Sequence, residues 1–214
     1  RLLDVGCGPG WFWASCGPLP AGLDLMLVDR SPAMVASALD RCSGLRLAHL
    51  AGETADAMRL PFADASFDGV IAMHMLYHVD DPAQAIAEMA RVLKPGGFLA
   101  VTTNGTGNLR EIYELTTVLG GMPVDPAALR FGFTEAEDLM RKTFGEVAVR
   151  RHPSRMRVTE AEDVFLAMTS FPPCEDAGEA ELAVFRRAID AFEKGGGAIE
   201  TEQERGLFLS RKAF

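Results

Sequence analysis

One segment near the start of the chain constrains the fold more than any other. The apolar run Leu2 to Val5 leads directly into the heptapeptide Asp-Val-Gly-Cys-Gly-Pro-Gly at residues 4–10. Glycines at alternate positions allow backbone angles that other residues resist, and they let the backbone pass close to a ligand because no Cβ intervenes. A strand, such a loop and then a helical pattern begin a βαβ unit, so we expect a parallel sheet.

The first half of the chain continues this alternation of short apolar runs and helical patterns. The runs predict strands at residues 2–5, 23–29, 45–50, 67–73 and 98–103, of which the third is the weakest signal. Helices begin at Ser31-Pro32 and at Asp81-Pro82, where an N-cap side chain precedes a proline at the first helical position. The alternation predicts a doubly wound α/β sheet.

The second half is less regular. Helical patterns occupy residues 108–119, 134–144, 160–168 and 179–193, and strand patterns occupy 146–150 and 206–211. We predict a single domain in which residues 1–104 form a ligand-binding core, while residues 105–214 complete the sheet and supply a helical cap. Because a domain seldom begins inside its own core, we also expect the natural protein to have residues upstream of Arg1.

Composition and charge exclude several classes of protein. The 21 Lys and Arg residues are outnumbered by 30 Asp and Glu, giving a net charge of −9, which argues against a nucleic-acid partner because that binding depends on neutralising phosphates. No apolar run reaches the roughly 18 residues of a membrane span. The four cysteines lack zinc-type spacing, so they favour free thiols in a reducing, cytoplasmic location, and we expect no metal site.

A second acidic position ends the second predicted strand. Asp29 lies 19 residues beyond Gly10 and immediately precedes Arg30. A carboxylate at this point can accept hydrogen bonds from both hydroxyls of a ribose, as it does in dinucleotide sites. The dinucleotide fingerprint also requires a small residue where the helix packs on the strand, and this chain has Trp11 there. NAD and FAD are therefore disfavoured.

Three further segments stand in a set order behind the glycine loop. They are Val-Asp-Arg-Ser-Pro-Ala-Met at 28–34, Ala-Asp-Ala-Met-Arg-Leu-Pro-Phe at 55–62, and Met-His-Met-Leu-Tyr-His-Val at 73–79, followed by Ala-Arg-Val-Leu-Lys-Pro-Gly-Gly at 90–97. Together with the loop they resemble the class I S-adenosylmethionine (SAM)-dependent methyltransferases, in particular small-molecule enzymes with a methyltransferase type 11 domain. The resemblance covers residues 1–104. It implies a Rossmann-like, seven-stranded sheet that is mostly parallel with an antiparallel last strand.

The resemblance also implies a cofactor and its binding residues. The cofactor is SAM and the product is S-adenosylhomocysteine (SAH). Asp4 and Gly6 would lie near the methionine portion, Gly8 and Gly10 would line the loop, and Asp29 would hold the ribose, with Arg30 as a further cofactor-binding residue. Asp56, Ala57 and Met58 would surround the adenine, and the Met73 carbonyl would face the amino-acid or sulfonium end.

Methyl transfer from a sulfonium is an in-line displacement that depends mainly on holding the acceptor close and aligned. A general base adds to this when the acceptor is a hydroxyl, and His78, then His74, are the nearest candidates after the fourth strand. The alternative for both is a structural role in capping the following helix. The acceptor atom (O, N or C) is left open by the sequence.

Acceptor recognition is expected to involve residues at the rim of the sheet and in the irregular half. The candidates are Trp11, Tyr77, Asn104, Arg110 and Tyr113. Trp11 and Trp13 either shape the floor of the pocket or lie in the core, and for Arg110 and Tyr113 the alternative is a solvated helix face. The basic residues between Arg150 and Arg157 either attract an anionic group or lie on an exposed edge strand. In the predicted cap, Phe165, Met168 and Phe171 either line the acceptor site or hold the cap together.

Some reactions and partners are disfavoured by what is missing. An Asn/Asp-Pro-Pro-Tyr/Phe tetrad, which would bind a planar amino group, is absent after the fourth strand, and so is the Pro-Cys nucleophile of cytosine-carbon methylation. The sequence therefore predicts a SAM-dependent methyltransferase acting on a small-molecule acceptor, as a monomer or homodimer. The alternatives are a non-catalytic SAM-binding relative and a SAM-using enzyme of different chemistry.

Overall fold

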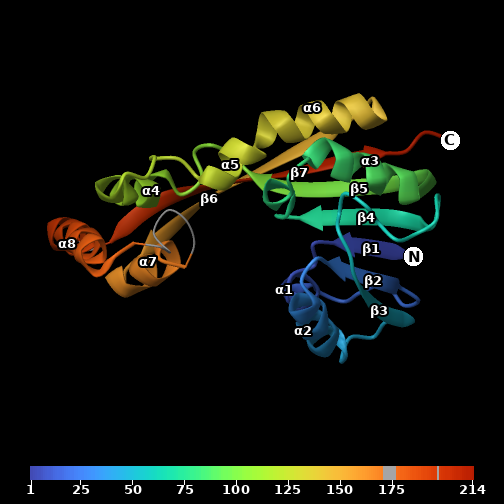
Figure 1. The fold of residues 1–214 in the computed structure, drawn as a ribbon, viewed down its shortest axis with the longest axis horizontal. Coiled ribbons are helices and arrows are strands. Elements are labelled where there is room, and N and C mark those ends of the chain that lie inside the picture. The colour runs from blue at the N-terminus through green and yellow to red at the C-terminus, as the bar shows by residue number, and fades with distance from the viewer. Residues whose placement is uncertain (171–176, 197) are drawn as a thin grey trace. The chain divides into compact units, whose positions relative to one another are not determined.

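The computed structural model describes residues 1–170, 177–196 and 198–214. Seven strands form one sheet in the order β3-β2-β1-β4-β5-β7-β6 (Figure 1). The strands are β1 (Leu2–Val5), β2 (Asp24–Asp29), β3 (His49–Thr54), β4 (Phe67–Met73), β5 (Leu93–Asn104), β6 (Ala148–Val158) and β7 (Ile199–Arg211). The α-helices are α1 (Trp11–Ser15), α2 (Pro32–Cys42), α3 (Pro82–Val92), α4 (Arg110–Thr116), α5 (Pro126–Arg130), α6 (Phe133–Phe144), α7 (Ala161–Met168) and α8 (Glu179–Gly196). Short 3₁₀ turns occupy Leu76–His78 and Thr117–Leu119.

The predicted mixture of strand directions is confirmed. Strands β3, β2, β1, β4 and β5 run parallel, with Leu3 of β1 opposite Met26 on one side and Val70 on the other. Strand β7 is antiparallel to β5. The Gly96 amide donates to the Lys212 carbonyl and the Gly105 amide to the Glu204 carbonyl, so the residue numbers of the partners decrease along β7 as they increase along β5. This is the seven-stranded, Rossmann-like doubly wound sheet expected from the sequence.

Several strand boundaries were predicted wrongly. The third strand runs over 49–54 instead of 45–50, since it pairs with β2 from His49 opposite Asp24 to Thr54 opposite Asp29. Its last residues, Glu53 and Thr54, are exposed on an edge strand, so they carry no apolar signal. Strand β5 begins at Leu93, which pairs with Phe67 before the register shifts and pairing resumes at Phe98.

The last two strands are longer than predicted because both are largely polar. β6 reaches Val158 and β7 begins at Ile199, where the sequence indicated only 146–150 and 206–211. Arg155 and Arg157 of β6 face Glu202 and Glu200 of β7 at 3.6 and 3.9 Å. Alternating charges of opposite sign therefore pair across these strands and conceal the apolar period on which a strand prediction depends.

The chain forms two compact units. Unit 1 comprises Arg1–Thr103, Thr134–Arg150 and Leu207–Phe214, and unit 2 comprises Asn104–Phe133 and Arg151–Gly206. The predicted functional division at residue 104 stays a prediction. Within the described ranges, no helix combines the length and the apolar character needed to cross a membrane.

The strand order of unit 1 reverses between β1 and β4, which leaves space at the carboxyl ends of these two strands. The chain passes from β1 to β2 to β3 in one direction, then from β4 to β5 in the other. Crossovers between parallel strands are right-handed, so α1 and α2 lie on one face of the sheet and α3 lies on the opposite face. The carboxyl ends of β1 and β4 are therefore not covered by a crossover, and ligands of open α/β sheets bind at such a point.

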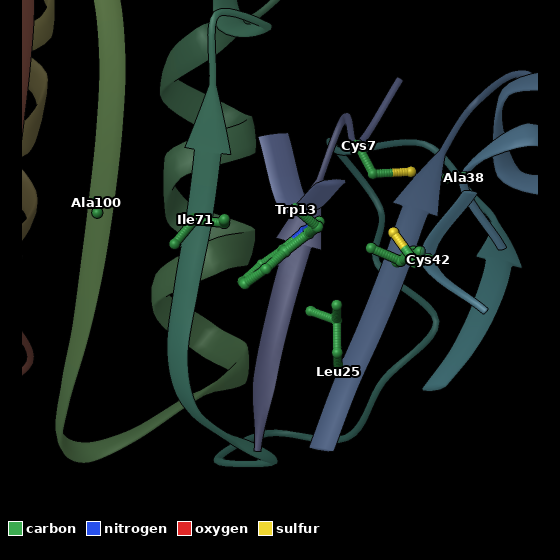
Figure 2. Packing of buried hydrophobic residues seen from close by; sticks show 8 residues of the cluster. Cys7, Trp13, Leu25, Ala38, Cys42, Ile71 and Ala100 are labelled. Atoms are coloured by element: carbon green, nitrogen blue, oxygen red, sulfur yellow. The ribbon is translucent and has the colours of Figure 1, made fainter. Parts of the chain in front are cut away.

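The face of the sheet under α1 and α2 has a tightly packed core. Figure 2 shows the Trp13 indole lying over the sheet between Ile71 of β4 and Leu25 of β2, with Cys7 and Cys42 beside it. Trp13 is only 4% exposed, so the core alternative considered for this residue is the one observed. The thiols of Cys7 and Cys42 are free and buried.

Unit 2 has a core of its own. It is formed by seven buried residues: Ile112, Tyr113, Val164, Met168, Phe185, Ile189 and Ile199. Phe165 packs against this cluster with its ring stacked on Phe185 at 6.0 Å, and Phe171 lies outside the described residues. Phe165 and Met168 thus hold the helices of unit 2 together, and the role of those helices as a substrate cap stays a prediction.

Gly10 provides a test of how tightly the first loop packs. Its φ is +81°, and a Cβ added there would lie 2.9 Å from the Ala38 Cα on α2. We expect Gly10→Ala to lower the free energy of unfolding by about 1–3 kcal/mol, because both the backbone angle and the helix contact are strained. Urea denaturation measures this, with Gly17→Ala as the control, because a Cβ at Gly17 meets nothing within 4 Å. Equal effects of the two substitutions would contradict the packing account.

Candidate functional site

A cavity of about 680 Å³ lies in unit 1 at the carboxyl ends of β1, β2 and β4. Its lining comes from four parts of the chain, each directly after a strand: the loop and first helix within 4–12, the start of α2 within 29–34, the turn at 55–58, and the segment 73–80. These are the four segments singled out in the sequence. The sheet topology brings them together because parallel strands end at the same edge.

The glycine loop is shaped by close contacts on both sides. Gly6 has φ +71°, and a Cβ there would lie 2.6 Å from the Met75 side chain on the segment after β4. Gly10 makes the close approach to α2, so the tight helix contact falls at position 10 and Trp11 points elsewhere. A Cβ at Gly8 would meet nothing within 4 Å. The loop backbone is therefore open toward the cavity at Gly8 while it is packed against protein at Gly6 and Gly10.

Asp29 fixes the loop and still has capacity for a ligand. Its Oδ2 accepts from the Gly8 amide at 3.0 Å, and its Oδ1 accepts from the Ser31 amide at 2.9 Å. An ionised carboxylate has about four lone-pair positions, so roughly two remain. The side chain lines the cavity, and the geometry fits the predicted acceptance of two ribose hydroxyls. Arg30 also lines the cavity, with an exposed side chain.

The turn after β3 presents both a carboxylate and backbone groups. Asp56 Oδ1 accepts from the Met58 amide at 2.8 Å, and the Arg59 amide donates to the Asp56 carbonyl at 3.0 Å. Asp56 is exposed, Ala57 is buried, and both line the cavity with Met58. A small residue between two longer ones leaves a flat backbone surface, which suits a planar ring.

Asp4 is a buried acid on the inner wall of the cavity. Its Oδ2 accepts from the Trp13 indole N–H at 2.7 Å, whereas its Oδ1 has no hydrogen-bond partner among the described residues. Burial raises the pKa of Asp4 to about 7, the Trp13 hydrogen bond opposes that rise, and the negative charge of Asp29 adds to it. Trp13 therefore orients this carboxyl group from beneath the cavity.

The segment after β4 carries the predicted bases. Met73, His74 and His78 all line the cavity. His74 has φ +53°, which is rare for a residue other than glycine, and its amide donates to both the carbonyl and the Oγ1 of Thr102. His78 is exposed, and its ring lies 4.5 Å from the ring of Tyr77, edge to face. The structure thus brings both histidines to the cavity, and a catalytic role stays a prediction.

The remaining acceptor candidates belong to unit 2. Asn104 Nδ2 donates to Asp125 Oδ2 at 2.8 Å, Arg110 is exposed and pairs with Glu114 one turn along its helix, and Tyr113 is 4% exposed in the core of unit 2. These contacts support the fold of unit 2, and contact with an acceptor stays a prediction for all three.

Sequence reasoning missed several residues that line the cavity. Phe12, Met34, Met75 and Asp80 are among them. Phe12 and Met34 are 44% and 41% exposed, beside Trp11 at 63%, so the cavity has an apolar wall on the side of α1 and α2. Arg41 lies over the Trp11 ring at 3.9 Å and holds it in place. Phe12 directly follows Trp11 in the first helical turn, and this pair of adjacent aromatic residues was the sequence signal that could have indicated the apolar wall.

The buried carboxyl group predicts an opposite effect of pH on stability from that of an ordinary acid. Because the pKa of Asp4 is raised from 3.8 to about 7, the folded state holds this proton more tightly, and stability falls as pH rises from about 4 to 7. Asp4→Asn removes this titration and keeps an oxygen for Trp13. We expect Asp4→Asn to raise the free energy of unfolding relative to the unsubstituted protein by more at pH 8 than at pH 5. The difference between the two increases should be on the order of 2 kcal/mol.

Thermal unfolding at the two pH values, analysed as free energies, measures this difference. Asp40→Asn is the matched control, since Asp40 is exposed on α2 outside the cavity. If the gain from Asp4→Asn is the same at both pH values, Asp4 does not hold a proton in the folded state near neutrality.

The first half of the chain is similar to known methyltransferases. Residues 3–101 match the family model described as a methyltransferase domain. The methyltransferase GfsG of Streptomyces halstedii is 41% identical over 105 residues, covering 47% of this chain and 36% of that protein. The 27-O-demethylrifamycin SV methyltransferase of Amycolatopsis mediterranei is 40% identical over 104 residues, covering 47% and 37%. The matched part of the chain thus spans little more than a third of the length of these relatives.

Solved structures extend the likeness to the whole fold. The YcgJ protein of Bacillus subtilis superposes with a TM-score of 0.67 at 19% identity, covering 100% of this chain and 92% of that one. The [4+2]-cyclase SpnF superposes with a TM-score of 0.57 at 24% identity, covering 100% and 75%. At these identities the likeness establishes the fold. Residues 3–101 therefore match a methyltransferase domain in sequence, and the whole chain shares the fold of these solved structures.

Proposed function

We propose that this protein binds SAM in the cavity of unit 1 and transfers its methyl group to a small-molecule acceptor. The observation that carries the proposal is the meeting of three features at one point of strand reversal. They are a glycine loop that is open at Gly8, a carboxylate at Asp29 with spare acceptor capacity, and the turn at Asp56 to Met58. They suit, in order, the amino-acid portion, the ribose and the adenine of the cofactor.

The residues of the chain bind and orient, and bound SAM supplies an activated methyl carbon. Asp29 accepts from the ribose hydroxyls, and Asp56 accepts from the adenine amino group while the Ala57 amide donates to the ring. Asp4 and the glycine loop enclose the amino-acid portion. Holding an acceptor in line with the reacting carbon supplies roughly 7–11 kcal/mol of the barrier reduction, so a general base is a secondary contribution. His78, or His74, takes the proton when the acceptor is a hydroxyl.

The apolar wall favours an acceptor with an apolar body. Trp11, Phe12 and Met34 are large, exposed to the cavity and adjacent to the loop. Exposed apolar side chains that share one concave surface mark a binding site more often than an accident of folding. The name of the Amycolatopsis relative states that it methylates a rifamycin derivative, a small molecule, which supports the same class of acceptor here.

Binding and product formation test the proposal in sequence. Isothermal titration calorimetry with SAM and SAH is expected to show one site, and NAD is expected not to bind. Release of SAH is then followed with a panel of phenols, quinols and macrolactones, with tRNA as the opposing substrate class. Binding of SAM without SAH release would favour a non-catalytic relative. Product formation with SAM unconsumed would favour different chemistry; the structurally similar SpnF is named a [4+2]-cyclase. Methylation of tRNA alone would overturn the small-molecule assignment.

Asp29 provides the sharpest test of the cofactor position. We expect Asp29→Ala to weaken SAH binding by about 1.5–3 kcal/mol, the range for hydrogen bonds to a charged group. Calorimetry measures the change, and Asp40→Ala, on the exposed side of α2, is the control. Affinity that is equal in Asp29→Ala and the unsubstituted protein would contradict the ribose assignment.

Trp11 tests the acceptor site separately from the cofactor site. With an acceptor from the panel, Trp11→Ala is expected to raise the acceptor KM about tenfold or more, because an aromatic contact that the bound acceptor covers is lost. Trp11→Phe is expected to retain most of the affinity. The SAH dissociation constant should change by less than about threefold in both variants. A KM unaffected by Trp11→Ala would remove Trp11 from the acceptor site.

A further inference from the structure

One face of α3 is polar and regularly spaced. Gln84, Glu88 and Arg91 recur at intervals of four and three residues, which places them on the same side of the helix. The opposite side carries the buried residues Ala85, Ile86, Met89 and Val92. The polar side therefore faces away from the sheet, and its contacts are with another part of unit 1.

All three polar side chains contact backbone groups at the end of the turn at 55–58 or in the segment directly after it. Gln84 Nε2 donates to the Met58 carbonyl at 3.4 Å, and Glu88 Oε2 accepts from the Leu60 amide at 3.0 Å. Arg91 Nη2 donates to the Leu60 carbonyl at 3.0 Å and Nη1 to the Phe62 carbonyl at 2.8 Å. Side chains of α3 thus satisfy the backbone groups that a neighbouring strand would satisfy in a sheet.

Glu88 and Arg91 hold each other in position through two hydrogen bonds. Arg91 Nε and Nη2 donate to Glu88 Oε1 and Oε2, both at 2.8 Å, and Arg91 Nη1 also reaches Asp64 at 2.7 Å. The hydrogen bond from Arg91 lowers the pKa of Glu88. This paired, forked geometry is specific to arginine, because a lysine ammonium cannot present two parallel N–H groups to a carboxylate and bind two carbonyls as well.

The segment that these side chains hold, residues 58–62, is continuous with the wall of the cavity. Met58 lines the cavity, and its amide donates to Asp56, whose own carbonyl accepts from Arg59. The turn that presents Asp56 and Ala57 is therefore held at one end by β3 and at the other by α3. Neither Glu88 nor Arg91 lines the cavity.

We propose that Arg91, with Glu88 and Gln84, is a positioning residue of the cofactor site that sets the adenine-binding turn from outside the cavity. The proposal rests on the function proposed above, since it assigns adenine to that turn. It makes the polar face of α3 responsible for cofactor affinity through backbone position, without contact with the ligand.

Lys212 offers a matched control on the same helix. Its ammonium donates to the carbonyls of Ala90 at 2.7 Å and Leu93 at 2.8 Å, at the carboxyl end of α3. Lys212→Met therefore perturbs the anchoring of α3 and leaves the polar face and its contacts with Leu60 and Phe62 in place.

The experiment measures SAH affinity by calorimetry in a double-substitution cycle. Arg91→Lys keeps the charge and loses the fork, and we expect it to weaken SAH binding about tenfold. With the contact to the adenine amino group already removed by Asp56→Ala, Arg91→Lys should weaken binding clearly less than it does in the unsubstituted protein, whereas its full effect should add to that of Asp29→Ala. Lys212→Met should lower the unfolding temperature and leave SAH affinity within about twofold. Glu88→Gln should resemble Arg91→Lys, in case one variant folds poorly.

Hydrogen exchange provides a readout that does not depend on ligand. In the Arg91→Lys protein without SAH, the amides at 56–60 should exchange faster while those at 6–10 are unchanged. The proposal is overturned if Arg91→Lys leaves SAH affinity unchanged, if its effect adds fully to that of Asp56→Ala, or if Lys212→Met weakens SAH binding as much. If the unsubstituted protein binds no SAH, the proposed function fails and this inference fails with it, whatever the exchange shows.

Discussion

The carboxylate of Asp29 is the interaction on which the candidate site depends. It connects the end of β2 to the glycine loop after β1 and to Ser31, the N-cap of α2, so it fixes the relative positions of the segments that form one wall of the cavity. The same group retains acceptor capacity for a ligand. This single carboxylate at the end of β2 thus orders the glycine loop before binding. The entropy cost of ordering the loop when a ligand binds is therefore lower.

The first half of the chain was largely predictable because its signals are local. The loop at 4–10, the Ser31-Pro32 helix start and the strand ending at Met73 follow from backbone chemistry and apolar periodicity, and a parallel sheet then brings their ends together. The strand at 49–54 and the pair formed by β6 and β7 were misplaced, because exposed or alternating charges carry no apolar period. The apolar wall at Phe12 and Met34 was missed because exposure is a tertiary property.

Function and stability are in opposition around Asp4. A carboxyl group 2% exposed, with one oxygen unpartnered in the described structure, is costly to the folded state unless it is protonated or paired with a ligand. The polar face of α3 has the opposite effect on stability. Arg91 and Glu88 form hydrogen bonds with backbone groups of the irregular segment around Leu60 and stabilise it. The site therefore combines one strained buried group with an external support that keeps the opposite wall in place.

The central claim is that the cavity at the strand reversal is built for an adenosyl thioether. A crystal structure of the protein grown with SAH tests it most directly. The account predicts the ribose hydroxyls within hydrogen-bond distance of Asp29 and the adenine ring against Ala57, with the amino-acid portion along the glycine loop. Density for SAH elsewhere on the protein, or a cavity left empty at saturating ligand, would contradict it.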